Sequence, residues 1–208
     1  MSDAPWVRRS YDPGLVSSDA VTFGYPVVLD LHGVPVLVVG AGGVAVRKIA
    51  GLVAAGAHVR VVAPEIDVRL DAARIREIRR RPYEAVDLDG VRLVVTATGV
   101  AAVDAAVAAD ARARSIWVNA ADQPEDCDLI LPAIARQGPI SVAVSTDGRS
   151  PALAARLRDR IASLLTPELA TLAEDLAAER SAIKASGGST EERDWSARID
   201  AVLGPRPR

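Results

Sequence analysis

Residues 34–63 read VPVLVVGAGGVAVRKIAGLVAAGAHVRVVA. The branched apolar run at 34–39 predicts a buried strand, and residues 44–53 carry apolar side chains at helical spacing. A second branched run follows at 58–63. A strand, a glycine-rich turn, a helix and a strand within about 30 residues form one right-handed βαβ unit. The sequence therefore predicts a parallel sheet of the Rossmann type.

The rest of the chain continues this alternation and then departs from it. Up to residue 120 we expect an arginine-rich helix-like stretch at 69–81, a short strand at 82–85, strands at 91–96 and 116–119, and an Ala-rich helix at 100–114. Beyond it we expect a hairpin of strands 129–133 and 140–145 joined by RQGP, helices starting at Ser150–Pro151 and Thr166–Pro167, and a last helix at 195–202.

These elements predict an α/β protein with four parts. Residues 1–24 show neither the helical nor the strand spacing of apolar residues, and we expect them to form a flexible N-terminal arm. A Rossmann domain at 25–128 is followed by a small α+β dimerisation region at 129–165 and a C-terminal helical region at 166–208. We expect a homodimer, because the strands after residue 128 have no obvious helical cover within the chain.

The composition excludes several classes of protein. The 25 basic and 27 acidic residues give a net charge of -2, which argues against a nucleic-acid binder that relies on an overall basic excess. One cysteine among 208 residues allows no intrachain disulfide, which favours a reducing cytoplasm. The longest apolar run, 34–46, is broken by Gly and Pro and is too short for a membrane span.

The glycine-rich turn predicts a dinucleotide site. Gly40, Gly42 and Ala45 fit the pattern G-x-G-x-x-A between a strand and a helix. The first glycine permits a tight turn, and the second lets the amides at Gly43 and Val44 approach a pyrophosphate at the positive end of the helix. A tight turn without a ligand is the alternative.

The end of the second strand bears on which dinucleotide is bound. The acid that commonly holds the ribose is slightly late here, so we expect ribose contacts from the backbone of Pro64 and from Glu65. No arginine directly follows the strand to meet a 2′-phosphate, which favours NAD over NADP. Arg69 leaves that choice open.

Two long segments carry a family resemblance. They are YPVVLDLHGVPVLVVGAGGVAVRK at 25–48 and VNAADQPEDCDLILPAIARQGPISVAVSTDGRSPALAARLR at 118–158. In their order and separation they resemble the stand-alone precorrin-2 dehydrogenases and the N-terminal module of siroheme synthase. The resemblance implies NAD-dependent oxidation of precorrin-2, a carboxylate-rimmed tetrapyrrole, to sirohydrochlorin, and in some members subsequent insertion of Fe²⁺. It also implies a dimer, with methylation carried out elsewhere.

The resemblance places the general acid/base at Asp122, in the segment VNAADQP. The position supports this role independently, because Asp122 follows a predicted strand at the carboxyl edge, where Rossmann ligands bind. An ordinary turn-forming Asp is the alternative. Asn119 is a candidate for substrate binding or for orienting that loop, although an Asn at a strand end usually satisfies local backbone groups.

Further residues are candidates for cofactor and substrate contacts. Relatives read Ala-Thr-Asp where this chain has Ala97-Thr98-Gly99, so one carboxylate is missing and Thr98 is expected to contact the cofactor through its backbone. Ser145 and Thr146 lie where the family places hydroxyl residues beside the substrate, and capping their own turn is equally plausible. Residues 136–160 have a local charge of +3, which suits a polycarboxylate. Within them, Arg149 is the best candidate to bind a substrate carboxylate.

The acidic residues around Cys127 predict no metal site. Asp126 and Asp128 flank this cysteine without a nearby His, so we interpret the carboxylates as solvated and Cys127 as a small buried side chain. A non-catalytic Rossmann module that senses NAD is the alternative function. In that case Asp122 would be dispensable and no tetrapyrrole would bind.

Overall fold

The structure, a computed structural model, describes residues 24–191 and 193–204. Residues 1–23 of the predicted N-terminal arm therefore lie outside the described residues. The chain divides into two compact units, Met1–Leu131 and Pro132–Arg208. Each unit is described separately below.

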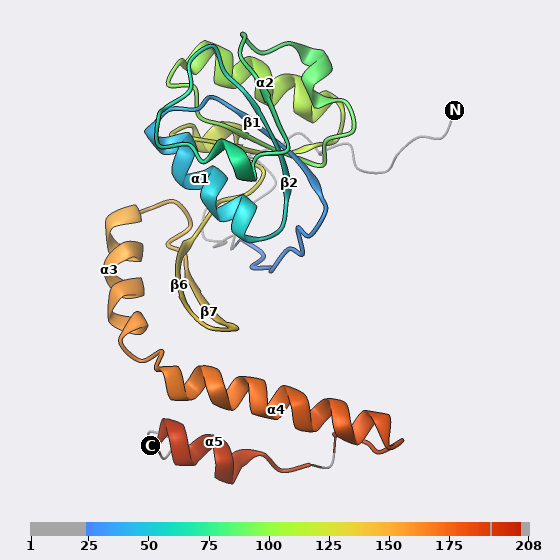
Figure 1. The fold of residues 1–208 in the computed structure, drawn as a ribbon. Coiled ribbons are helices and arrows are strands. Elements are labelled where there is room, and N and C mark those ends of the chain that lie inside the picture. The colour runs from blue at the N-terminus through green and yellow to red at the C-terminus, as the bar shows by residue number, and fades with distance from the viewer. Residues whose placement is uncertain (1–23, 192, 205–208) are drawn as a thin grey trace, which may run out of the picture. The chain divides into compact units, whose positions relative to one another are not determined.

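The first unit contains a five-stranded parallel sheet in the order β3-β2-β1-β4-β5. Figure 1 labels β1 and β2 of this sheet, which pair with each other. Its strands are β1 (Pro35–Val39), β2 (His58–Val62), β3 (Glu77–Arg79), β4 (Leu93–Thr96) and β5 (Trp117–Ala120). Helix α1 (Gly43–Ala54) connects β1 to β2, and helix α2 (Ala101–Ala113) connects β4 to β5. The predicted Rossmann-type sheet is confirmed.

The two faces of the sheet have separate cores. On one face Ala45, Ile49 and Leu52 of α1 pack against alternate residues of the strands, including Val38. On the other face Val107, Ala108 and Ala111 of α2 pack against the remaining alternate residues, including Leu37. Both faces of a parallel sheet are covered by its crossover helices, which explains the near-continuous runs of Val and Leu in β1 and β4.

The prediction of a helix-like stretch at 69–81 is wrong. This segment holds only the short 3₁₀ helix η1 (Ala72–Arg74) and then β3, which adds to the edge of the sheet beside β2. The expected strand at 82–85 is also absent, and a 3₁₀ helix, η2 (Ala85–Leu88), starts there instead. In β3 the backbone pairs with the edge strand β2. The side chain of Ile78 also packs against the core on the α1 face of the sheet, which a solvated arginine-rich helix would not provide.

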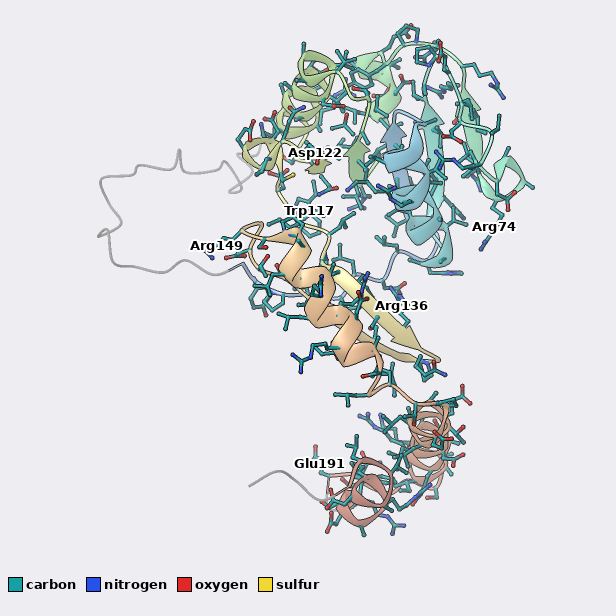
Figure 2. The ribbon with its side chains drawn as sticks, turned by 90° about the vertical axis from the view of Figure 1, so that its left-hand side faces the viewer. Arg74, Trp117, Asp122, Arg136, Arg149 and Glu191 are labelled. Atoms are coloured by element: carbon teal, nitrogen blue, oxygen red, sulfur yellow. The ribbon has the colours of Figure 1, made fainter. Side chains whose placement is uncertain are left out.

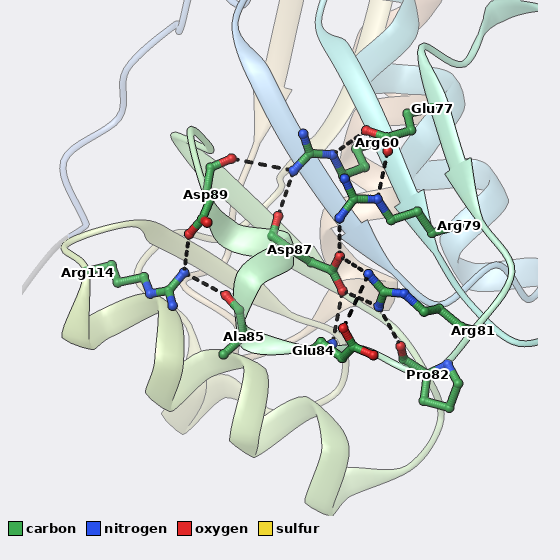
Figure 3. Close-up of polar contacts among 10 residues, drawn as sticks. All are labelled: Arg60, Glu77, Arg79, Arg81, Pro82, Glu84, Ala85, Asp87, Asp89 and Arg114. Carbon is green, nitrogen blue, oxygen red and sulfur yellow. Dashed lines mark hydrogen bonds and ion pairs between the residues drawn. The ribbon is translucent and has the colours of Figure 1, made fainter.

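Ion pairs stabilise this edge of the sheet (Figure 3). The fully buried carboxylate of Asp87 in η2 accepts hydrogen bonds from Arg79 at 2.5 Å and from both terminal nitrogens of Arg81 at 2.8 and 2.7 Å. Glu77 bridges Arg60 and Arg79, with both N–O distances at 2.7 Å. Arg79 and Arg81, two of the arginines that suggested a polar helix, thus join β3 and the residues after it to η2, and Arg60 joins β2 to β3.

The second unit begins with an antiparallel hairpin of β6 (Ala133–Gln137) and β7 (Ile140–Val144). The predicted hairpin is confirmed, but its first strand is not at 129–133. Leu129 belongs to the first unit instead, where its carbonyl oxygen accepts a hydrogen bond from Asn119 at 2.9 Å. The turn at Gly138 and Pro139 places Gln137 opposite Ile140.

Three helices follow the hairpin. Helix α3 (Pro151–Ala162) packs against both β6 and β7, so the expectation that these strands lack helical cover within the chain is wrong. Helices α4 (Pro167–Ala185) and α5 (Ser196–Leu203) contact each other, and Glu179 pairs with Arg193 and Arg198. The predicted N-caps are confirmed, because Ser150 accepts from the Leu153 amide and Thr166 from the Leu169 amide.

No helix among the described residues has both the length and the apolar character that a membrane span requires.

Candidate functional site

The carboxyl edge of the parallel sheet is the candidate site. Strand β1 leads to α1 on one face, and its neighbour β4 leads to α2 on the other. Connections that leave adjacent strands toward opposite faces open a crevice at the carboxyl ends of those strands, where ligands of open α/β sheets bind. The glycine-rich turn, Thr98 and Asp122 all follow strands at this edge.

The first glycine of the turn is required by the backbone. Gly40 has φ +98°, and a Cβ at this position would lie 2.4 Å from the carbonyl oxygen of Ala97, just beyond β4. The Gly40 amide donates to the Val62 carbonyl at 2.9 Å, so the turn is joined to the end of β2. A side chain at Gly40 would separate the turn from β4.

The second glycine faces open space. A Cβ at Gly42 would meet nothing within 4 Å. Gly42 is the N-cap of α1, has no side-chain cap bond, and precedes a first turn without an acidic residue. The first amides of the helix, from Gly43 and Val44 onward, are therefore left to bind an anion.

Arg69 lies against the start of α1. A Cβ at Gly43 would be 2.8 Å from its Nη2 atom. The guanidinium donates to both carboxylate oxygens of Asp67 at 2.9 and 2.6 Å, and these hydrogen bonds lower the pKa of Asp67 to about 2. The Asp67 amide donates to the Ala41 carbonyl at 3.1 Å. The loop after β2 thus returns to the glycine turn and brings one cation and one anion with it.

Pro64 and Glu65, the expected ribose contacts, are exposed and follow β2 at the same edge. Asp67 lies two residues further along, and the bond from its amide to the turn was not expected from the sequence. The sequence did carry a signal for Asp67, because an acid near the end of the second strand is the usual ribose partner.

Thr98 is held by a carboxylate that sequence reasoning missed. Asp104, in the first turn of α2, is 2% exposed. It accepts from the Thr98 amide at 3.1 Å and from the Thr98 hydroxyl at 2.9 Å, and it also pairs with the hydroxyl of Thr96. The backbone of the loop after β4 is therefore fixed without a carboxylate at Gly99.

Asn119 is a polar residue in a row of valines. Register pairs Val61 with Val38, Val38 with Val95, and Val95 with Asn119 across the sheet. Asn119 is 5% exposed, its Nδ2 donates to the Leu129 carbonyl at 2.9 Å, and its Oδ1 accepts from Lys48 Nζ at 2.8 Å. Lys48 was not expected from the sequence, because its position within α1 does not indicate where its side chain reaches.

Asp122 has a backbone conformation that is uncommon for a residue with a side chain. Its φ is +61°, a left-handed conformation that non-glycine residues adopt infrequently, and its side chain is exposed (Figure 2). The neighbouring Ala121 amide donates to the Thr96 carbonyl at 2.8 Å, which joins this turn to the end of β4. Asp tolerates the left-handed region better than most residues, and such outliers concentrate at functional sites.

The residues around Cys127 hold the loop after Asp122. The Cys127 sulfur accepts from the Ala120 amide at 3.2 Å, and burial raises the pKa of this thiol. Asp126 pairs with Arg112 at 2.9 Å, and Asp128 accepts from the Val118 amide at 3.0 Å. Within the described residues, no group of three or more His, Cys, Asp or Glu side chains could hold a metal ion.

The remaining candidates belong to the second unit. The Ser145 hydroxyl accepts from the Asp147 amide at 3.1 Å, and the Thr146 hydroxyl bonds to both the amide and the carbonyl of Ser150 at 3.0 Å. Both hydroxyls thus cap the turn before α3. The Arg149 side chain is 70% exposed and lies 3.8 Å from the carboxylate of Asp147 (Figure 2).

Comparisons with known proteins agree with this architecture. A family of NAD(P)-binding domains matches residues 27–133, about half of the chain, and the central region of sirohaem biosynthesis proteins matches residues 137–164. A solved structure titled SirC, precorrin-2 dehydrogenase, superposes with a TM-score of 0.64 at 30% identity. The match covers 86% of this chain and 87% of that one.

The curated relatives include siroheme synthases. The protein from Methylococcus capsulatus is 45% identical over 71% of this chain and 32% of its own length. The protein from Chromobacterium violaceum is 44% identical over 86% of this chain and 39% of its own length. The matched part is thus between 32% and 39% of these two relatives. The chain belongs to the family of NAD(P)-binding siroheme-biosynthesis proteins that includes siroheme synthase and the precorrin-2 dehydrogenase SirC.

Proposed function

We propose that this chain is an NAD-dependent dehydrogenase that oxidises precorrin-2 to sirohydrochlorin. The observation that carries the proposal is a carboxylate in a left-handed turn after β5, at the same sheet edge as an open glycine turn. The similarity to SirC and to siroheme synthases supports the choice of substrate.

The glycine turn fits a dinucleotide. The open face at Gly42 admits a pyrophosphate, and the amides of Gly43 and Val44 are placed to bind it. Bound NAD would supply a hydride acceptor. We assign the ribose contacts to Pro64 and Glu65 and a backbone contact to Thr98, whose position Asp104 fixes. We favour NAD over NADP because the Arg69 guanidinium already donates to Asp67 through its Nε–Nη2 edge, which leaves it less available to a 2′-phosphate.

Asp122 is the proposed proton acceptor. Conversion of precorrin-2 to sirohydrochlorin removes two hydrogen atoms from the macrocycle, one as a hydride to the oxidised cofactor and one as a proton. The exposed carboxylate of Asp122 accepts that proton and passes it to solvent. Asn119 holds the strand from which this turn leaves, and it stays a candidate for an additional substrate contact.

The second unit supplies groups suited to a polycarboxylate. Arg149 is exposed and has only a long pairing with Asp147, so its guanidinium is available to a substrate carboxylate. Ser145 and Thr146 shape the turn that presents it, and they remain candidates for direct hydrogen bonds to the substrate.

We further propose that the protein works in the cytoplasm as a homodimer. On the outer face of the hairpin, Ile134 lies opposite Ala143, and both are exposed. Leu164, just after α3, is 66% exposed. Apolar side chains of this kind are typical of subunit interfaces. Light scattering on the purified protein tests this: a dimer that Ile134→Glu dissociates supports it, and a monomeric wild type excludes it.

One assay series tests the proposed function. Purified protein receives precorrin-2 with NAD, with and without Fe²⁺, and the absorbance of NADH and of the tetrapyrrole is followed. Stoichiometric sirohydrochlorin and NADH are expected without Fe²⁺. If siroheme forms faster with Fe²⁺ than in a protein-free control, the protein also catalyses iron insertion. Binding of NAD without any turnover would contradict the dehydrogenase and favour a module that senses NAD.

A further inference from the structure

Lys48 is a half-buried cation that the proposed chemistry has not yet used. It lies in α1, between the exposed Arg47 and the buried Ile49. Side chains of a helix lean toward its N-terminus, which in α1 is the end at the glycine turn. The long Lys48 side chain crosses to β5, where its Nζ lies 2.8 Å from Asn119 Oδ1.

This contact joins the two halves of the candidate site. Helix α1 starts at the proposed cofactor turn, and β5 ends two residues before Asp122. Asn119 sits in a row of valines on the α1 face, so its buried amide requires polar partners. Lys48 supplies the donor for its oxygen, and the Leu129 carbonyl supplies the acceptor for its nitrogen.

Charged and ionisable groups on neighbouring elements also act on Lys48. Burial lowers the pKa of Lys48, whereas the side chains of Cys127 and Asp122 raise it and Arg47 lowers it further. The charged or ionisable groups that act on this ammonium are thus Asp122 and Cys127 from the segment after β5 and Arg47 from its own helix, and Asn119 of β5 is its hydrogen-bond partner.

We propose that Lys48 is a positioning residue of the dehydrogenase, which holds Asn119 and places a positive charge toward the carboxylate of Asp122. The inference rests on the proposed role of Asp122 as proton acceptor. The Lys48–Asn119 bond keeps the end of β5 in register with the helix that starts at the cofactor turn. The cofactor at the glycine turn, which accepts the hydride, and Asp122, which accepts the proton, therefore keep a fixed distance and orientation relative to each other.

The charge of Lys48 also has a chemical consequence. An ammonium favours the charged form of a carboxylate near it, and only the charged form accepts a proton. Loss of the ammonium should therefore change the pH profile of the reaction.

The first test needs neither cofactor nor substrate. The Lys48 side chain is titrated by NMR in the wild-type protein and in Asp122→Asn, an exposed substitution that suits the left-handed backbone. The pKa of Lys48 is expected to fall in Asp122→Asn, because a negative charge that raises it is removed. An unchanged pKa of Lys48 would overturn the inference, whatever the enzyme catalyses.

The second test compares Lys48→Met, Lys48→Arg and the control Arg47→Met, which removes one positive charge from the exposed side of the same helix. In Lys48→Met we expect kcat/KM for precorrin-2 to fall roughly tenfold to a hundredfold, with the acid limb of its pH profile moved to higher pH. Lys48→Arg should restore much of both, and NAD affinity should be unchanged.

Two outcomes of this comparison would contradict the proposal. Lys48→Met could match Arg47→Met in rate and pH profile, in which case the ammonium has no special role. Alternatively, Lys48→Met could lose NAD affinity with an unmoved acid limb, which would assign Lys48 to cofactor binding. If no variant or wild type oxidises precorrin-2, the proposed function fails, and the NMR titration still decides whether Lys48 and Asp122 are coupled.

Discussion

The carboxylate of Asp104 accepts hydrogen bonds from the amide of Thr98 at 3.1 Å and from its hydroxyl at 2.9 Å. One buried side chain at the start of α2 thereby fixes the loop that follows β4. Gly40 lies against the same loop, so the position of the cofactor turn depends on this contact.

Asp104→Ala is expected to destabilise the protein by about 2–3 kcal/mol, because it leaves the hydroxyl of Thr96 and the amide of Thr98 without their acceptor. Urea unfolding measures the loss. Asp104→Asn keeps one acceptor oxygen and should lose less. Equal stability of the alanine variant and the wild type would show that water replaces the carboxylate at no cost.

The first two glycines of the turn should respond differently to alanine. Gly40→Ala forces a side chain into φ +98° and toward the Ala97 carbonyl, so we expect a loss of at least about 2 kcal/mol in stability. Gly42→Ala meets no atom within 4 Å in the folded protein, so it should fold normally but bind NAD weakly. Thermal melting and calorimetric titration with NAD separate the two effects.

Gly51→Ala, within α1 and also without atoms within 4 Å, is the control and should bind NAD as the wild type does. Normal NAD affinity in Gly42→Ala would place the pyrophosphate elsewhere.

Release of Arg69 should shift the choice of cofactor. Asp67→Ser removes the carboxylate that accepts from Nε and Nη2 of the guanidinium, and serine can still accept from the Arg69 amide. The freed cation lies in the loop after β2, where a 2′-phosphate would bind. We expect affinity for NADP to rise about two- to fivefold relative to NAD. The same gain in an Asp67→Ser, Arg69→Ala double variant would refute the role of Arg69.

The Asp87 network predicts a specific acid sensitivity. Burial alone would raise the pKa of Asp87, but hydrogen bonds from Arg81, the Glu84 amide and Arg79 outweigh it and hold the pKa at about 2. Because the folded-state pKa is below the usual 3.8, the stabilisation is complete above about pH 4 and is lost as pH falls toward 2. The loss amounts to roughly 2 kcal/mol.

The free energy of unfolding of wild type and Asp87→Asn, measured from about pH 5 to pH 2, tests this. The difference between them should shrink as pH falls, since only the wild type loses this contribution. Asp89→Asn, at an exposed carboxylate that pairs with Arg114, should show little change in that difference. A difference for Asp87→Asn that stays constant with pH would contradict the assigned pKa.

The sequence was most informative where one periodicity dominates. The runs at 34–39 and 58–63 have one interpretation as buried strands, and the N-caps Ser150 and Thr166 mark helix starts through local hydrogen bonds. The segment at 69–81 was misread because its arginines find partners on other elements. Arg79 and Arg81 bind Asp87, which local propensity cannot anticipate.

The same reason explains what was missed in the candidate site. The place of Asp122 just after a strand could be predicted from its segment, whereas its role stays a prediction. Lys48 and Asp104 act through contacts with Asn119 and Thr98, and Lys48 is 71 positions from its partner. Such pairings arise from the register of the parallel sheet and the packing of its helices, and the pattern of residue types along the chain does not contain them.

The role of Asp122 is the central claim, and single-turnover oxidation of precorrin-2 with saturating NAD tests it most directly. Asp122→Asn should slow the reaction by about two to four orders of magnitude with NAD affinity unchanged, whereas Glu125→Gln, three positions away, should react at the wild-type rate. A wild-type rate in Asp122→Asn would contradict the account, because no proton acceptor would then be needed at the end of β5.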